Sequence, residues 1–165
     1  MKLKGEVRKP PASAQLSVRA IVIENRKVLM VQHEHLDKRG VFWVFPGGGV
    51  EKGETTIEAA IRETIEETGI TVKPLGIVHL REAETEGERG FEVYFVCEKI
   101  SGEVTRGYDP EDPFGEGIKD TRWISSSELN QIVFYPETLR ELLPQWVDND
   151  NVPMMPLPEY KVIER

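Results

Sequence analysis

The sequence contains a single cysteine, Cys97, which excludes an internal disulfide and fits a reducing compartment. Cys97 lies in an apolar run that is typical of a strand, so we expect a small buried side chain there rather than a nucleophile. No apolar run is long enough to cross a membrane, and no signal-peptide stretch follows the first residues. These absences favour a cytoplasmic protein without a membrane partner.

Basic residues are outnumbered as well. The chain has 21 Lys and Arg against 29 Asp and Glu, which gives a formal net charge of −8. Non-specific binding of nucleic acid needs many phosphate contacts from basic side chains, so this class of function is not expected. An acidic surface does not attract an anionic substrate either. A phosphorylated ligand would therefore need metal ions and a few local basic residues.

The sequence also lacks internal repeats and low-complexity blocks. With 165 residues and a hydrophobic content of 39%, the chain is long enough for one domain with its own core. We expect residues 1–165 to form this single domain. Residues 1–14 are expected to be a loose N-terminal arm, and residues 149–165 a C-terminal tail that straps across the surface or extends from it.

Apolar runs separated by turn residues predict a mixture of strands and helices. Strands are expected at 18–23, 28–32, 41–45, 72–81, 91–99 and 121–124. Helices are expected at 56–68, from residue 125, and at 136–143 with Pro136 in the first turn. This order predicts an α/β fold in which a sheet is layered between helices.

The expected helix at 56–68 carries Arg62, Glu63, Glu66 and Glu67. Glutamates three or four positions apart on a helix repel one another by roughly 0.2–0.5 kcal/mol per pair. At about 100° per residue, the three glutamates share one face. The opposite face, which we expect to pack on the core while the glutamates are solvated, holds Ile57, Ile61, Thr64, Ile65 and Thr68. A hard cation such as Mg²⁺ would turn the repulsion between the carboxylates into attraction.

The two ends of this helix are also specified by the sequence. Thr55 and Glu58 predict a capping box at its start, and Gly69 suits the left-handed position that closes it. The run from Pro46 through Gly47 to Gly49 predicts a tight turn whose backbone can approach a ligand closely. A carbonyl group of this turn could act as a further metal ligand.

The spacing of these residues resembles the signature of the Nudix hydrolases, G-x5-E-x7-R-E-U-x-E-E-x-G-U, in which U is a bulky aliphatic residue. The matching positions are Gly48, Glu54, Arg62, Glu63, Glu66, Glu67, Gly69 and Ile70. Thr64 departs from the pattern at the first U, but threonine is close to valine in volume, so we expect only weaker packing. Trp43 and the run Phe45-Pro46-Gly47 also look like this family. The resemblance implies an α/β/α sandwich with a mixed sheet.

The resemblance further implies hydrolysis of a phosphoanhydride bond in a nucleoside di- or triphosphate derivative, with Mg²⁺ or alternatively Mn²⁺ as the cofactor. By this resemblance, Glu66 and Glu67 are metal ligands, and Glu63 is a ligand or the general base. Arg62 is expected to orient these carboxylates, and Glu54 to hold the junction between loop and helix or to lie behind the metal ligands. Which glutamate acts as the base is left open.

Further ligands are expected from two loops. They are the Gly47 carbonyl and, from the later segment 106–120, Glu116, for which a solvated carboxylate is the alternative. Gly48 and Gly69 are expected to have structural roles. The substrate-binding residues are left open. Candidates that could instead pack, pair or stay solvated are His33, His35, Trp43, Phe45, Phe91, Tyr94, Trp123, Arg19, Arg81 and Arg89.

Two other functions stay open at this point. A nucleotide-binding Nudix domain without turnover is one, although the intact Glu63, Glu66 and Glu67 argue against it. An RNA 5′-end pyrophosphatase is the other, and it would need a basic groove that a net charge of −8 does not suggest. In each case the expected partner is a nucleotide-type ligand, and a homodimer is left open.

Overall fold

The computed structural model describes residues 15–34, 40–85, 88–105, 107 and 117–163. The expected N-terminal arm at 1–14 and the candidate ligand Glu116 lie outside the described residues. The strands are β1 (Gln15–Glu24), β2 (Lys27–Glu34), β3 (Val41–Val44), β4 (Gly47–Gly49), β5 (Thr71–Thr85), β6 (Glu88–Ser101), β7 (Asp120–Ser125) and β8 (Phe134–Tyr135). The helices are α1 (Thr56–Thr68), α2 (Ser126–Leu129) and α3 (Leu142–Asn149), with a 3₁₀ turn, η1 (Glu137–Leu139), before α3.

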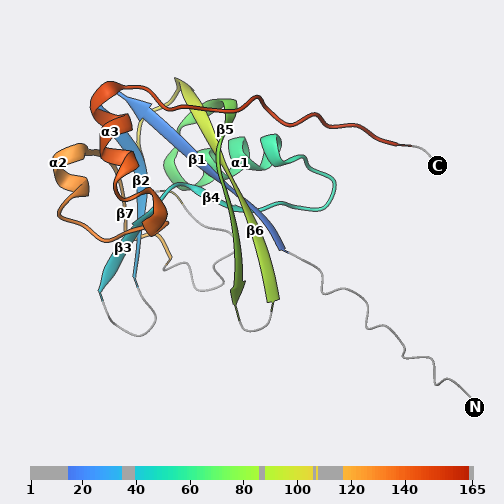
Figure 1. Cartoon of the computed structure of the whole chain (residues 1–165), viewed down its shortest axis with the longest axis horizontal. Coiled ribbons are helices and arrows are strands. Elements are labelled where there is room, and N and C mark those ends of the chain that lie inside the picture. The colour runs from blue at the N-terminus through green and yellow to red at the C-terminus, as the bar shows by residue number, and fades with distance from the viewer. Residues whose placement is uncertain (1–14, 35–39, 86–87, 106, 108–116, 164–165) are drawn as a thin grey trace, which may run out of the picture.

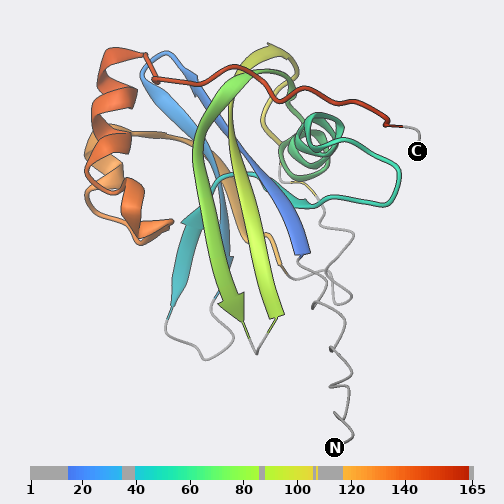
Figure 2. The same cartoon turned by 45° about the vertical axis from the view of Figure 1, so that its right-hand side comes forward.

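The strands form a mixed sheet in the order β5-β6-β1-β2-β3-β8, with β4 paired to β1 and β7 to β2. The pairs β1–β6 and β3–β8 are parallel, and the other pairs are antiparallel. β1 and β2 pair only beside their turn, at Ile23↔Val28 and Glu24↔Lys27. The sheet therefore opens from this turn into two halves, one with β1, β4, β5 and β6 and the other with β2, β3, β7 and β8 (Figure 2).

Helices cover both faces of the sheet (Figure 1). α1 packs on an apolar cluster that includes Val18, Ala20, Val22, Leu29, Ala59, Ala60, Ile70 and Phe95. α2, η1 and α3 pack on a second cluster that includes Ile21, Met30, Trp43, Phe45, Tyr94, Leu129, Leu139, Leu143 and Val147. The α/β/α sandwich with a mixed sheet is thereby confirmed. Cys97 is buried at 3% exposure, as its apolar surroundings predicted.

Two elements differ from their prediction. The helix expected at 136–143 is wrong: a 3₁₀ turn occupies part of that range, and α3 begins only at Leu142. Pro144 explains the shift, because it lies in the first turn of α3, where a missing N–H costs nothing. The tight turn expected after Pro46 is instead the short strand β4.

β4 exists because its residues lack side chains. Gly47 pairs with Arg19 and Gly48 with Val18 on β1. A Cβ atom on Gly47 would stand 2.0 Å from the Val18 carbonyl oxygen, and the φ of Gly47 is 153°. No other residue could bring the backbone this close to β1.

The C-terminal residues form a strap before they leave the domain. The backbone of Met155 exchanges two hydrogen bonds with Ile77 on β5, at 2.9 and 2.7 Å, and the strap continues past α1 (Figure 1). Tyr160, Val162 and Ile163 are largely exposed. Within the described residues, the structure contains no helix with the length and apolar character needed to cross a membrane.

The ends of α1 are confirmed as predicted. Thr55 and Glu58 form both hydrogen bonds of the capping box, and Gly69 closes the helix with φ 74°. A Cβ atom on Gly69 would also meet the Thr105 hydroxyl at 2.6 Å. Gly53 has a positive φ of 91° too, but open space surrounds its missing side chain.

This difference predicts that Gly69→Ala destabilises the protein more than Gly53→Ala does. Backbone strain alone costs roughly 1–2 kcal/mol for a residue with a side chain at such a φ, and both variants incur it. Only Gly69→Ala adds the clash with Thr105. Urea unfolding followed by circular dichroism measures both losses. An equal loss of unfolding free energy in the two variants would show that the Thr105 side chain can move aside without a cost.

Candidate active site

Two of the three glutamates on the acidic face of α1 are buried, which corrects the prediction that this face is solvated, whereas the side chain of Glu66 is 33% exposed. Glu63 is 2% and Glu67 is 3% exposed, whereas Ile65, expected on the packed face, is 42% exposed. The buried residues of α1 are Ala59, Ala60, Glu63, Thr64, Glu67 and Thr68. The glutamate face is enclosed because β4 has no side chains in the way. A Cβ atom on Gly48 would stand 2.6 Å from Glu63 Oε1.

The backbone of β4 contacts the site through both of its polar groups. The Gly47 N–H donates to Glu67 Oε2 at 2.9 Å, and the Gly47 carbonyl accepts from Arg19 NH1 at 3.2 Å. The same guanidinium nitrogen donates to the Phe45 carbonyl at 3.4 Å. The structure therefore points the N–H of Gly47 at the carboxylate of Glu67. The Gly47 carbonyl, which was expected to bind a metal, instead accepts a hydrogen bond from the guanidinium group of Arg19.

Arg62 forms hydrogen bonds with three of the acidic side chains around α1. It donates to Glu54 at 2.7 and 3.1 Å, to Glu63 at 2.8 Å and to Glu66 at 3.1 Å. It also donates to the Gly49 carbonyl at 3.0 Å and lies 3.9 Å from the carboxylate of Glu51. The hydrogen bond with Glu54 raises the pKa of Arg62 and lowers the pKa of Glu54, so both groups are charged at neutral pH.

The donor chemistry of this cluster fits a hard divalent cation. Its carboxylates outnumber the one guanidinium that they share, and two of them are buried, where an excess of negative charge is costly. Carboxylate oxygens are the ligands that Mg²⁺ prefers. Among the described residues, no three acidic, histidine or cysteine side chains converge on one point. Arg62 instead lies between Glu63 and Glu66, and Gly47 holds Glu67.

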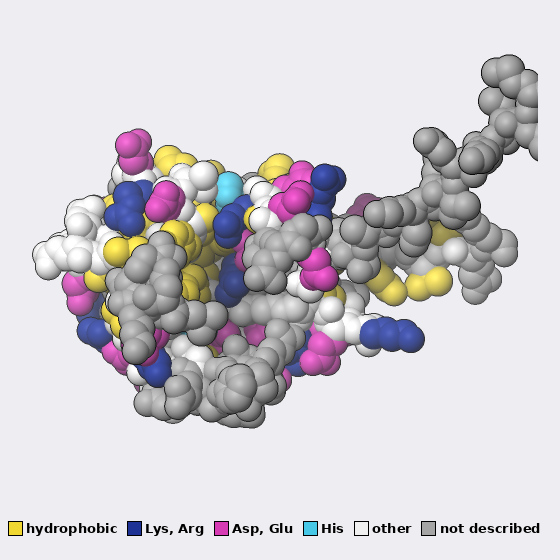
Figure 3. All heavy atoms as spheres, turned by 90° about the horizontal axis from the view of Figure 1, so that it is seen from below, with side chains coloured by type: hydrophobic (Ala, Val, Ile, Leu, Met, Phe, Trp, Pro, Cys, Tyr) yellow, Lys and Arg dark blue, Asp and Glu magenta, His cyan; other side chains and the backbone are white. Residues whose placement is uncertain are grey.

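A cleft between the two halves of the sheet adjoins this cluster. Figure 3 shows hydrophobic and basic side chains together on the walls of this hollowed face. Its narrowest part is lined by Arg19, Val44, Phe45, Arg81, Glu92, Tyr94 and Tyr135. Further out, a cavity of 480 Å³ is lined by residues that include Gln15, Ser17, Arg81, Arg89 and Glu92.

Glu92 is the central group of this cleft. It accepts from Arg19 Nε at 3.3 Å, from Arg81 NH1 at 3.0 Å and from the Tyr94 hydroxyl at 3.0 Å. Burial acts to raise the pKa of Glu92, but the charges of Arg19 and Arg81 outweigh it, so the pKa is lowered. Burial and the nearby Glu92 raise the pKa of Tyr94 to about 12. Two guanidinium groups thus share one carboxylate, which leaves net positive charge in the cleft of an acidic protein.

Aromatic rings line the half of the cleft that belongs to β2, β3 and β8. His33 stacks on Phe42 with ring centroids 5.7 Å apart, and Phe42 meets the edge of Tyr135 at 5.5 Å. Phe42 shares its strand face with Val44, which lines the narrow part of the cleft. These rings offer apolar area opposite the guanidinium groups of Arg19 and Arg81.

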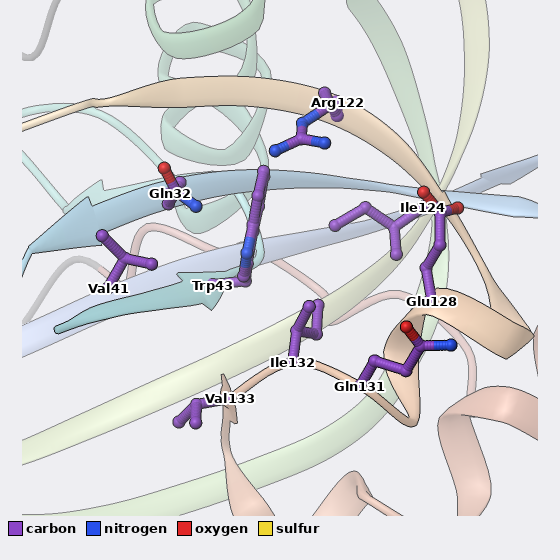
Figure 4. A pocket seen from close by; sticks show the side chains of 9 residues that line it. All are labelled: Gln32, Val41, Trp43, Arg122, Ile124, Glu128, Gln131, Ile132 and Val133. Atoms are coloured by element: carbon purple, nitrogen blue, oxygen red, sulfur yellow. The ribbon is translucent and has the colours of Figure 1, made fainter.

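A second cavity, of 360 Å³, lies on the other face of β2, β3 and β7 (Figure 4). Arg122 lies over the ring of Trp43 at 4.9 Å, and Trp43 is only 3% exposed. Arg19 on the wall of the cleft, by contrast, donates to the Gly47 carbonyl, and the Gly47 N–H donates to Glu67 on α1. We therefore place the candidate site in the cleft. Trp43 is part of the core. Trp123 also packs against the core, and the Lys99 ammonium group lies 5.9 Å from the centre of its ring.

Sequence reasoning named Arg19, Arg81 and Tyr94 but missed Glu92, Phe42 and Tyr135. The sequence does contain an indication for Glu92. This carboxylate directly precedes the apolar run of β6, and it lies two positions before Tyr94, so both side chains are on the same face of the strand. No comparable signal marks Tyr135, since β8 pairs with β3 only through the fold. Arg89 pairs with Glu82 at the surface, and His35 lies outside the described residues.

The charges of the cleft generate a prediction for His79, whose ring meets Tyr94 edge-on at 5.2 Å. Burial lowers the pKa of His79, and the charge of Arg81 lowers it further, while Glu92 opposes both. Arg81→Met should therefore raise this pKa toward the usual value of about 6.5. Because a lowered histidine pKa disfavours the folded state in acid, the variant should also lose less stability as the pH falls below about 6.5.

Titration of the histidine ring protons by NMR measures this pKa directly. Arg89→Met is the matched control, because Arg89 pairs with Glu82 at 3.6 Å and does not act on His79. An unchanged pKa in Arg81→Met would mean that the charge of Arg81 does not reach the ring.

Comparison with known proteins shows the family of this chain. The model of the NUDIX domain matches residues 14–146. The ADP-ribose pyrophosphatase of Methanocaldococcus jannaschii is 31% identical over 133 residues, which cover 79% of this chain and 73% of that protein. Nudix hydrolase 6 of Arabidopsis thaliana is 37% identical over 92 residues, 53% of this chain but only 32% of that longer relative.

Solved structures share the fold of this chain. The structure of a NUDIX hydrolase from Nitrosomonas europaea superposes with a TM-score of 0.68 at 21% identity, covering 90% of this chain and 98% of that one. The family model spans β1 to α3, and thus both the glutamates of α1 and the cleft. The chain therefore belongs to the Nudix hydrolase family.

Proposed function

We propose that this protein hydrolyses a phosphoanhydride bond in a nucleoside di- or triphosphate derivative, with Mg²⁺ or alternatively Mn²⁺ as its cofactor. The observation that carries the proposal is the pair of buried carboxylates, Glu63 and Glu67, held against a side-chain-free strand beside a cleft with basic walls. The ADP-ribose pyrophosphatase among the relatives supports the reaction class.

Glu63, Glu66 and Glu67 would hold the metal, with the Gly47 carbonyl and Glu116 as further candidates. A bound divalent cation would neutralise charge on the diphosphate and polarise the phosphorus atom. Glu63 is also a candidate for the base that accepts a proton from the attacking water, because it is buried and held by Arg62 at 2.8 Å. Arg62 would keep the carboxylates in position through its contacts with Glu54, Glu63 and Glu66.

The cleft would bind the rest of the substrate. Arg81 is 43% exposed in its side chain, so its guanidinium can reach a phosphate group, while Arg19 is more enclosed at 23%. Charge-assisted hydrogen bonds from guanidinium groups suit phosphate oxygens. The nucleobase of the substrate could stack against Phe42 or Tyr135 on the opposite wall of the cleft.

The function is tested by the variant Glu67→Gln. Glutamine keeps the shape of the side chain and an oxygen that can accept from the Gly47 N–H, but it removes the charge. We expect kcat/KM to fall by more than about 100-fold, the upper end of losses caused by residues that merely support metal ligands. The thermal unfolding midpoint should stay close to that of the wild type. Glu98→Gln, an exposed carboxylate on β6, is the control that should keep full activity.

Activity is measured by chromatography of the products formed from a panel of substrates with Mg²⁺, with Mn²⁺ and with EDTA, because cleavage of a phosphoanhydride in ADP-ribose or a nucleotide sugar gives two phosphate esters and no free phosphate. The panel contains ADP-ribose, nucleotide sugars, dinucleoside polyphosphates, nucleoside triphosphates and 5′-triphosphorylated RNA. Full activity of Glu67→Gln would refute the ligand assignment. No cleavage of any compound would favour a binding domain, and cleavage only of the RNA would favour an RNA-end pyrophosphatase.

A further inference from the structure

The C-terminal end of α1 carries Glu66 and Glu67 in its last turn. The last four carbonyl groups of a helix have no partner within the helix. No basic residue lies in this last turn to neutralise them. The position of the two glutamates therefore depends on the groups outside α1 that bind these carbonyls.

Those groups come from the segment after β6 and from β7. The Thr105 N–H donates to the Thr68 carbonyl at 2.9 Å, and the Gly107 N–H donates to the Glu67 carbonyl at 3.0 Å. The Thr121 hydroxyl, on β7, also donates to the Glu67 carbonyl, at 3.4 Å. Glu67 is thus held at its carbonyl by Gly107 and Thr121, and at its carboxylate by the N–H of Gly47 at 2.9 Å.

The packing at Gly107 leaves no room for a side chain. A Cβ atom there would stand 2.1 Å from the Glu66 carbonyl oxygen and 2.3 Å from the Glu67 carbonyl carbon. Both are backbone atoms, so no change of rotamer relieves the contact. Gly102 approaches the same helix end, where its Cβ would stand 2.3 Å from the Gly69 carbonyl oxygen.

We propose that Gly107, together with Thr121, is a positioning residue that fixes Glu66 and Glu67 for metal binding by closing the end of α1. This inference rests on the function proposed above. A side chain at position 107 must push the backbone of 107 and the last turn of α1 apart, which breaks the hydrogen bond to the Glu67 carbonyl and frees a turn whose two carboxylates are tied at their other ends to Gly47 and Arg62. Residues that orient metal ligands typically change metal affinity 10- to 100-fold when they are replaced.

The test compares Gly107→Ala with Gly90→Ala in the full chain. Gly90 lies on β6, and its Cβ would meet only atoms at 3.8 and 3.9 Å, so the same substitution causes no clash there. Binding of Mn²⁺ without nucleotide is measured by electron paramagnetic resonance. We expect the Kd for Mn²⁺ to rise at least 10-fold in Gly107→Ala and to stay unchanged in Gly90→Ala.

Two further measurements distinguish positioning from a general loss of structure. Hydrogen exchange of the Gly69 amide, which bonds to the Ile65 carbonyl at 2.9 Å, should speed up in Gly107→Ala. In turnover assays, the Mg²⁺ concentration for half-maximal rate should rise, while much of the rate returns at saturating Mg²⁺.

Thr121→Val keeps the test decisive if Gly107→Ala folds poorly. It removes only the hydroxyl that donates to Glu67, without adding volume, and should raise the Kd for Mn²⁺ a few-fold. Wild-type Kd and exchange rates in both variants would overturn the inference. A wild-type protein that binds no Mn²⁺ would overturn the proposed function and this inference together.

Discussion

Two carboxylates buried side by side on one helix face set the conditions for the rest of this structure. Removing a carboxylate from water costs several kcal/mol unless charge and hydrogen bonds replace the lost hydration. Glu63 receives a guanidinium from Arg62, and Glu67 receives a backbone N–H from Gly47. The second contact requires the backbone of β4 to lie directly on the helix. A side chain at position 48 would collide with Glu63, and one at position 47 with Val18 on β1, so both positions need glycine.

The same contacts connect the buried carboxylates to the cleft. Gly47 binds Glu67 through its N–H and Arg19 through its carbonyl, and Arg19 in turn pairs with Glu92. Glu92 also holds Arg81 at 3.0 Å, at the wider part of the cleft. Each group in this series is oriented by its neighbour, so the acidic and basic parts of the site form one hydrogen-bonded unit. An acidic protein can in this way present positive charge where a phosphate group would enter.

The sequence predicted those features that depend on neighbouring residues. The bounds of α1, its capping box and the left-handed Gly69 all follow from local side-chain chemistry. The burial of Glu63 and Glu67 was predicted wrongly, because it depends on β4, which approaches α1 only after β1 has paired with it. The periodicity of α1 alone could not reveal that the helix face in contact with the glycine strand β4 is the buried one.

The other differences have similar origins. α3 was placed too early because two prolines, Pro136 and Pro144, each suit a first helical turn, and only the packing of Leu143 and Val147 selects the second. The cleft residues Glu92 and Tyr135 come from strands in different halves of the sheet. Their proximity is a property of the topology, so no local pattern could indicate it.

The strap around Met155 has a consequence for the behaviour of the protein in concentrated solution. β5 ends the strand order, and a strand in that position offers free N–H and C=O groups as a template for another chain. Met155 occupies both backbone groups of Ile77, and Gly76 lets it come that close, since a Cβ there would stand 2.3 Å from the Met155 carbonyl oxygen. The chain thereby shields part of its own sheet margin, which opposes the edge-to-edge stacking that begins aggregation.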